Sequence, residues 1–200
     1  MTVRANIPKE LKDEIYSNIL EKQEGNDLPI LYTFVGYYPD CSLIISEIIK
    51  DLEDKINIIT VDSDDEEKLD DIINNIQKRE SILLVLENIE RLTNIELLDK
   101  LFEIYQEGSL RIIGSCEVYL PNYSPVFYSL MGFGMQYIAT EDLISYDKKL
   151  TTKNRDIIIS LAIDEISFEE ACKQVEDMTP EEVIYHKGKM DMEINDLNML

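Results

Sequence analysis

The 200-residue chain carries 41 acidic and 19 basic residues, which gives a formal net charge of −22, and 44% of its residues are hydrophobic. This hydrophobic share excludes wholesale disorder, and the length suits one domain, or one domain with a small appendage. A chain with this negative charge is repelled by a phosphate backbone or an anionic membrane, and we therefore expect no nucleic acid as a partner. The charge serves either as a solvated surface or as an acidic docking face for a protein.

The three cysteines are far apart in the sequence, and His186 is the only histidine. This composition predicts neither a disulfide framework nor a zinc site, and it favours a reducing compartment. The first residues lack the apolar core of a signal peptide, and no run of about 18 apolar residues occurs. We therefore expect a cytoplasmic location and no direct insertion into a membrane.

Short apolar runs alternate with segments of helical periodicity from the start of the chain to about residue 140. The expected elements are a helix at 8–22, a strand at 30–35, a helix at 42–52, a strand at 56–61, a helix at 64–78, a strand at 82–86, a helix at 94–106, and strands at 110–114 and 135–139. Such alternation predicts βαβ crossovers and a mostly parallel sheet. The strands are apolar throughout, as expected when helices cover both faces. The predicted fold class is therefore an α/β three-layer sandwich with a five-stranded sheet.

The pattern changes after Tyr146, where three short helices are expected with no strand between them, at 152–163, 167–177 and 179–189. Ser167 and Glu170 stand at capping-box spacing before the second of them. We therefore predict a first domain at 1–147, which includes the helix at 8–22, and a helical C-terminal appendage at 148–200. Residues 190–200 are only loosely specified.

The segment after the first strand has the position and length of a phosphate-binding loop, whose pattern is GxxxxGK[ST]. Gly36 matches the first glycine, but Cys41 replaces the second glycine, Ser42 the lysine and Leu43 the magnesium-binding hydroxyl. These losses remove backbone access to the β-phosphate, one positive charge and one metal ligand. Asp40 adds a negative charge where the anion would sit. We expect neither ATP nor magnesium as a cofactor, and no metal site.

Two later strands end in the same degenerate way. The third strand runs into Glu87 and Asn88, where an ATPase carries Asp-Glu, and Asn88 cannot serve as a general base. The fourth strand ends at Ser115 and Cys116, where a polar sensor pair is expected. We predict no catalytic residues at these positions.

Taken in order, these segments resemble an FtsK/SpoIIIE-type motor domain over roughly residues 28–140. The segments that carry the resemblance are ILYTFVGYYPDCSLIISEIIKDL, ILLVLENIERL, LRIIGSCEVYLPN and the turn at 132–135. The similarity is greatest to the degenerate C-terminal ATPase module of type VII secretion motors, the EssC/YukB type, with Ser115 and Cys116 in place of the Thr-Gln pair. The resemblance implies a terminal module at the cytosolic end of a membrane-anchored motor, which recruits secreted proteins or regulates neighbouring motor domains.

Aromatic residues gather in the segment between the last two strands. They are Tyr119, Tyr123, Phe127, Tyr128 and Phe133. They either cap the core or offer anchors to a protein partner, since interfaces favour such side chains. Tyr37 and Tyr38 would extend this surface, so the vacated nucleotide edge is one candidate docking surface and the helical appendage is the other.

Alternative functions remain open. One alternative is a weakly active ATPase that a neighbouring subunit completes in trans. Another is a redox-inert thioredoxin-like adaptor, since Tyr-Pro-Asp-Cys before a helix resembles a thioredoxin motif with one cysteine. Cys41 at a helix start is either a nucleophile with a lowered pKa or a half-buried structural residue. The acidic run at 62–67 lacks the pattern of a calcium loop, so an acidic helix start is expected.

Overall fold

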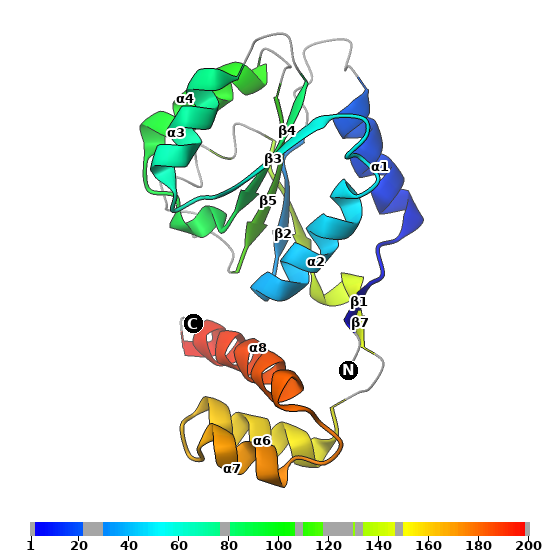
Figure 1. Ribbon diagram of the computed structural model, residues 1–200, viewed down its shortest axis with the longest axis vertical. Helices are drawn as coiled ribbons and strands as arrows, with labels where there is room; N and C mark the ends of the chain where they lie inside the picture. Colours follow the sequence, from blue (N-terminus) through cyan, green and yellow to red (C-terminus); the bar gives the residue numbers. More distant parts are fainter. Residues whose placement is uncertain are drawn as a thin grey trace. The chain divides into compact units, whose positions relative to one another are not determined.

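The computed structural model describes residues 3–21, 30–76, 81–106, 110–117, 130, 134–146 and 150–198. The chain forms two compact units (Figure 1). We call Ala5–Ile144 the sheet unit, and Ser145–Leu200 together with Met1–Arg4 the helical unit. The division after Ile144 lies three residues before the boundary expected at 147.

The sheet unit is built on five parallel strands in the order β3-β4-β5-β2-β6. The strands are β2 (Tyr32–Val35), β3 (Asn57–Asp62), β4 (Ile82–Glu87), β5 (Leu110–Cys116) and β6 (Gln136–Ala139). All four neighbouring pairs are parallel, so the predicted five-stranded parallel sheet is confirmed.

Helices cover both faces of this sheet. They are α1 (Lys9–Leu20), α2 (Tyr38–Ile49), α3 (Glu66–Asn75) and α4 (Ile95–Gln106), with short 3₁₀ turns η1 (Ile89–Arg91) and η2 (Glu141–Leu143). Figure 1 shows α1 and α2 on one side of the sheet and α3 and α4 on the other. Right-handed crossovers require α2 on one face and α3 and α4 on the other, because the chain moves one way across the sheet from β2 to β3 and the opposite way from β3 to β5. The predicted three-layer sandwich is confirmed.

The central strands supply the core. All of β2 and β5 and the first five residues of β4 are buried, as expected for strands that helices cover on both faces, and the buried residues include Thr33 and Arg111 as well as apolar ones. Leu83 and Leu84, which are neighbours on β4 and point to opposite faces, are both fully buried. Strand β3 is more exposed, because it lies at one edge of the sheet and only Val61 is fully buried.

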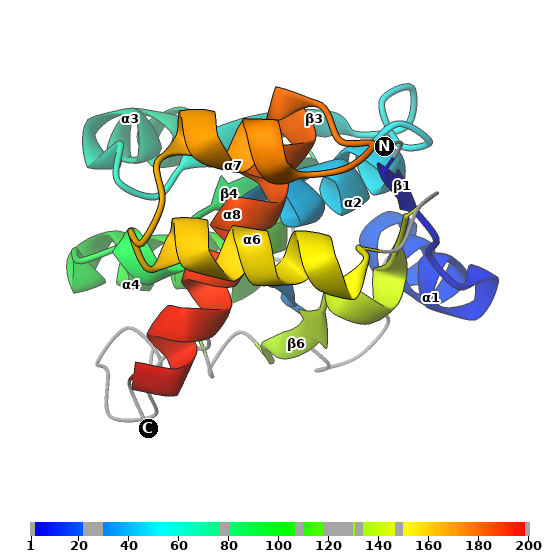
Figure 2. The same cartoon turned by 90° about the horizontal axis from the view of Figure 1, so that it is seen from below.

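A two-stranded ribbon pairs β1 (Val3–Ala5) with β7 (Ile144–Tyr146), and the division of the sequence into the two units falls within both strands. The sequence did not predict these strands. Helices α6 (Thr152–Ala162), α7 (Phe168–Gln174) and α8 (Pro180–Asn198) form the helical unit, and α8 crosses the other two in Figure 2.

The helical unit has a small core of its own, made by Ile158, Leu161, Ala171, Val183 and Met190. The predicted capping box is confirmed: the Ser167 hydroxyl accepts from the Glu170 N–H, and the Glu170 carboxylate accepts from the Ser167 N–H. The tail was expected to be loosely specified, but α8 continues to Asn198, because Met190 and Ile194 on its later turns pack into this core. Within the described residues, no helix combines the length and the hydropathy needed to cross a bilayer.

Candidate functional site

The candidate site is the edge of the sheet where β2, β4 and β5 end. From β2 the chain crosses one face of the sheet to β3, whereas α3 and α4 cover the other face. Strand β2 is therefore the point at which the direction of the connections reverses, and ligands of open α/β sheets bind at the carboxyl ends of strands beside such a point. Gly36, Glu87, Asn88, Ser115 and Cys116 all belong to this edge.

The expected phosphate-binding loop is absent at this edge. Helix α2 begins at Tyr38, only two residues after Gly36, and Pro39 stands in its first turn. Proline there is preorganised for a helix start, since its ring fixes φ and the missing N–H would have no partner inside the helix. As a result Cys41, Ser42 and Leu43 lie inside α2 rather than in a loop that could surround a phosphate.

Gly36 has a packing reason to be glycine. Its N–H donates to the carbonyl of Cys116 at 3.0 Å, and its φ of +153° is one that other residues rarely adopt. A Cβ built on Gly36 would lie 1.9 Å from Oγ1 of Thr140, which is itself buried. The side chain of Thr140 therefore excludes any larger residue at position 36, without a phosphate being involved.

Cys41 is a structural residue. Its fully buried thiol lies 3.4 Å from the carbonyl oxygens of both Phe34 and Gly36, to which it can donate. Burial raises the pKa of this thiol to about 12, and the nearby carboxylates of Asp40, Glu117 and Glu90 act in the same direction. A thiol that stays protonated is a poor nucleophile. The alternative of a lowered pKa at Cys41 is therefore wrong, because burial and like charge outweigh the helix start.

The ends of β3, β4 and β5 are tied to one another by hydrogen bonds. Asn88 adopts a left-handed conformation with φ of 54°, and its buried side-chain amide donates to the Asp62 carboxylate at 2.7 Å. Its backbone N–H donates to the hydroxyl of Ser115 at 3.1 Å. The hydroxyl of Ser63 donates to the carbonyl of Glu87 at 2.6 Å. We call Asp62, Ser63, Glu87, Asn88 and Ser115 the edge network.

Tyr38 joins α2 to this network. Its hydroxyl donates to Oε1 of Glu87 at 3.2 Å, and burial together with the Glu87 charge raises the pKa of the phenol. The contact joins the first turn of α2 to the end of β4.

The electrostatics also oppose an anion. Three carboxylates, Asp40, Glu90 and Glu117, act on the buried end of α2, and one oxygen of Glu90 is buried with no hydrogen-bond partner in the structure. The other Glu90 oxygen lies 3.4 Å from the Glu117 N–H. In the part of the chain that the structure describes, no group of three or more acidic, cysteine or histidine residues is arranged to hold a metal ion. A phosphate beside the buried end of α2 would thus meet like charge.

The other predicted residues are placed as follows. Ser115 and Cys116 are buried at the end of β5, and Ser42 and Leu43 are half-buried on α2. Tyr37 is the half-buried N-cap of α2, beside Tyr38. Tyr119, Tyr123 and Phe127 lie outside the described residues.

Sequence reasoning missed Asp62, Ser63, Glu90 and Thr140 as members of this edge. Asp62 and Thr140 directly follow apolar runs, just as Glu87 does, so the rule that polar residues end buried strands would have found both. The role of Glu90 has no such signal, since it depends on the 3₁₀ turn that follows β4.

Comparison with known proteins supplies no family by sequence. No protein-family model matches the chain, and no curated protein matches it significantly. Among solved structures, similarity extends to Cdc6p from Pyrobaculum aerophilum, at 11% identity and a TM-score of 0.49 over 94% of this chain and 60% of that one. AMPPCP-bound DnaA from Aquifex aeolicus is similar at 13% identity and a TM-score of 0.48, over 96% of this chain and 68% of that one. PCH-2 from C. elegans follows at 9% identity and a TM-score of 0.45, over 78% and 45%.

The parallel sheet itself, with β2 between β5 and β6 and helices on both faces, excludes a thioredoxin-like fold, whose sheet is mixed. The chain has an α/β fold of five parallel strands with helices on both faces, and its helix α2 begins two residues after Gly36.

Proposed function

We propose that this chain is a non-catalytic, P-loop-like interaction domain that binds protein partners and uses neither ATP nor magnesium. The observation that carries the proposal is the hydrogen bond from Tyr38 to Glu87, together with the early start of α2. These two features occupy the nucleotide edge with the chain's own side chains. Catalysis would need a phosphate-binding loop, and the start of α2 at Tyr38 leaves no such loop between Gly36 and Leu43.

The proposed setting is a type VII secretion motor, in which this domain recruits secreted proteins or regulates a neighbouring ATPase domain on the cytosolic side. The support is the sequence resemblance to the degenerate terminal module of such motors and the strongly acidic charge, which disfavours nucleic acid. The half-buried Tyr37 and Tyr38 beside the edge network are candidate docking residues. This setting is tested by co-purification with the motor's neighbouring ATPase domain. The test compares the wild-type chain with the Tyr37→Ala/Tyr38→Ala variant.

Calorimetric titration with ATP and with ADP, each with and without magnesium, tests the absence of nucleotide binding. We expect no heat of binding up to about millimolar nucleotide, equivalent to weaker than about −4 kcal/mol. The Tyr38→Phe variant removes the bond to Glu87 but keeps the ring, so it serves as the matched variant that tests the hydroxyl alone. Micromolar binding by wild type would refute the proposal. If Tyr38→Phe alone bound, Tyr38 would be shown to act as an occluding residue.

An ATPase completed in trans would give a different result. A neighbouring subunit can supply an arginine or a base, but the phosphate-binding loop itself must come from the strand–helix turn of this chain. Nucleotide binding that appears only when the neighbouring ATPase domain is added would therefore support that alternative.

A further inference from the structure

Strand β3 is an edge strand whose outer side has no strand partner among the described residues. The N–H of Ser63, just beyond β3, donates to Glu87 on the β4 side. Because successive residues of a strand turn their backbone groups to opposite sides, those of Ile58 and Thr60 face the open edge. The carbonyl of Thr60 meets only the exposed ammonium of Lys68, at 3.4 Å, which is a weak contact that a stronger donor can replace.

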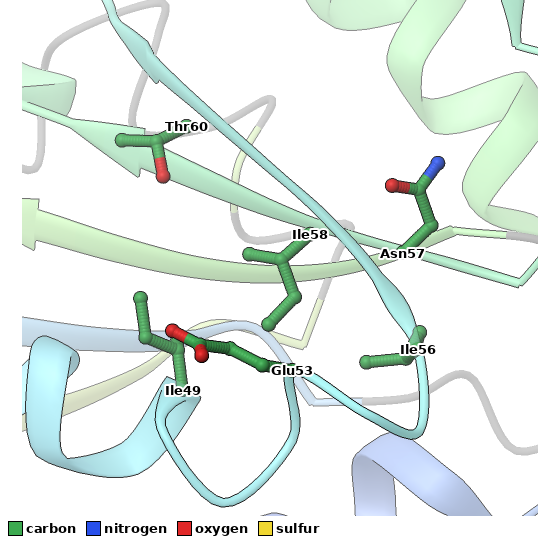
Figure 3. A pocket seen from close by; sticks show the side chains of 6 residues that line it. All are labelled: Ile49, Glu53, Ile56, Asn57, Ile58 and Thr60. Atoms are coloured by element: carbon green, nitrogen blue, oxygen red, sulfur yellow. The ribbon is translucent and has the colours of Figure 1, made fainter.

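Hollows with mixed aliphatic and polar linings lie on both faces of this edge, the first more polar and the second more aliphatic. The first, of about 430 Å³, is lined by Ile49, Glu53, Ile56, Asn57, Ile58 and Thr60, and Figure 3 shows their side chains around it. The second, of about 270 Å³, is lined on the α3 side by Ile59, Ile72, Ile76 and Ile82. We call them the edge grooves. Since α2 and α3 lie on opposite faces of the sheet, the two edge grooves flank β3 from both sides.

The charge around the edge grooves is mostly negative, although Lys68 lines the second. Residues 50–76 contain ten carboxylates and three lysines, a net charge of −7. Glu53 lines the first edge groove and Asp71 the second. A cationic segment is therefore attracted to this edge, whereas a second copy of β3 would bring two such segments together.

We propose that the open edge of β3 binds an extended segment of a partner protein that carries alternating aliphatic residues flanked by lysine or arginine. The segment would add a sixth strand through the backbone groups of Ile58 and Thr60. Its aliphatic side chains share one face of the added strand and would enter the more aliphatic second edge groove, and the polar residues between them would face the first, since successive side chains of a strand point to opposite faces. This inference deepens the proposed function and rests on it only in treating the chain as a protein-binding domain, because the β3 edge is separate from the edge network.

The test measures binding of the fluorescein-labelled peptide KKVTITVKK to the full chain by fluorescence anisotropy, without nucleotide. Thr60→Pro removes an outward N–H while leaving the ladder to β4 intact, because proline is tolerated where an edge N–H faces solvent. Thr60→Val keeps the N–H and is the matched control. We expect Thr60→Pro to bind at least tenfold more weakly than wild type, and Thr60→Val to bind within about twofold of it.

A second measurement on the wild-type chain is independent of any variant. In the free protein the amides of Ile59 and Val61, which face β4, should exchange slowly, and those of Ile58 and Thr60 should exchange fast. Saturating peptide should slow exchange at Ile58 and Thr60 at least tenfold. The proposal is overturned by equal binding to Thr60→Pro, by unchanged exchange at these two amides, or by equally tight binding of EEVTITVEE. Dimerisation of the chain that Thr60→Pro abolishes would also overturn it, in favour of a second copy. Because no nucleotide is present, failure here leaves the calorimetric test of the proposed function untouched.

Discussion

Replacement of Gly36 by alanine separates a packing role of this glycine from a phosphate-binding role. The added Cβ would lie 1.9 Å from Oγ1 of the buried Thr140, so one of the two residues must move. Overpacking of this kind costs about 1–3 kcal/mol. The φ of +153° adds about 1–3 kcal/mol for any residue with a side chain. We therefore expect Gly36→Ala to lower the free energy of unfolding by about 4 kcal/mol.

Urea denaturation followed by far-ultraviolet circular dichroism measures this loss, since the chain has no tryptophan to report by fluorescence. Gly134→Ala is the matched control, because Gly134 is exposed with φ of 66° and its alanine variant should cost only about 1–2 kcal/mol. Adding Thr140→Ala to Gly36→Ala removes the closest contact and should restore about 1–3 kcal/mol, which a double-mutant cycle isolates.

Two results would refute this account of Gly36. One is a loss for Gly36→Ala no larger than for Gly134→Ala. The other is an absence of coupling between Gly36 and Thr140, which would show that the structure yields elsewhere. Either result would reopen a role for Gly36 in ligand binding.

Three further predictions concern other parts of the chain. Below pH 9 a thiol reagent should react with the half-buried Cys172 much faster than with Cys41, because burial raises the pKa of the Cys41 thiol to about 12 and keeps it protonated. Mass spectrometry identifies the labelled cysteine, and fast labelling of Cys41 would contradict the prediction. Asn88→Asp should lower the free energy of unfolding by about 2 kcal/mol at pH 7, because it sets a carboxylate beside that of Asp62 in place of a 2.7 Å hydrogen bond. In urea titrations this loss should shrink below about pH 5, where one added proton lets the two carboxyl groups share a hydrogen bond. Ser167→Ala should destabilise the helical unit by about 1 kcal/mol in thermal unfolding, because it removes half of a capping box, and an unchanged midpoint would show that α7 is held by its core contacts alone.

The layers of the fold were predictable because they depend on burial, which determines the pattern of apolar residues within each short segment of the sequence. A strand such as Ile82–Glu87, covered on both faces, must be apolar at nearly every position, and its helical neighbours must repeat apolar residues every three or four positions. The ribbon of β1 and β7 gave no such signal, because three-residue strands with mixed burial have no period to detect.

The start of α2 was predictable in principle but was misplaced. The interpretation of residues 36–43 as a loop rested on glycine spacing, whereas Pro39 after two tyrosines is itself a signal for a helix start. The contacts of the edge network are different in kind. The Asn88–Asp62 bond exists because β3 lies beside β4, and the Asn88–Ser115 bond because β5 lies on the other side. The alternation of strands and helices fixes that a sheet forms but not the order of its strands, so these pairs had no basis in the sequence.

The distinction between missing side chains and a missing loop can be tested by restoring the consensus. The variant Cys41→Gly/Ser42→Lys/Leu43→Thr carries the complete pattern GxxxxGK[ST] from Gly36 onward. We expect it to bind ATP and magnesium no better than wild type in calorimetry, because Pro39 and the Tyr38–Glu87 contact still begin the helix before the restored residues. The added glycine should also cost about 1 kcal/mol in an α2 interior and empty the space of the buried Cys41 thiol, so circular dichroism must first show that the variant is folded. Micromolar nucleotide binding by this variant would mean that the backbone of the edge can still open, and that only three side chains separate this domain from a working nucleotide site.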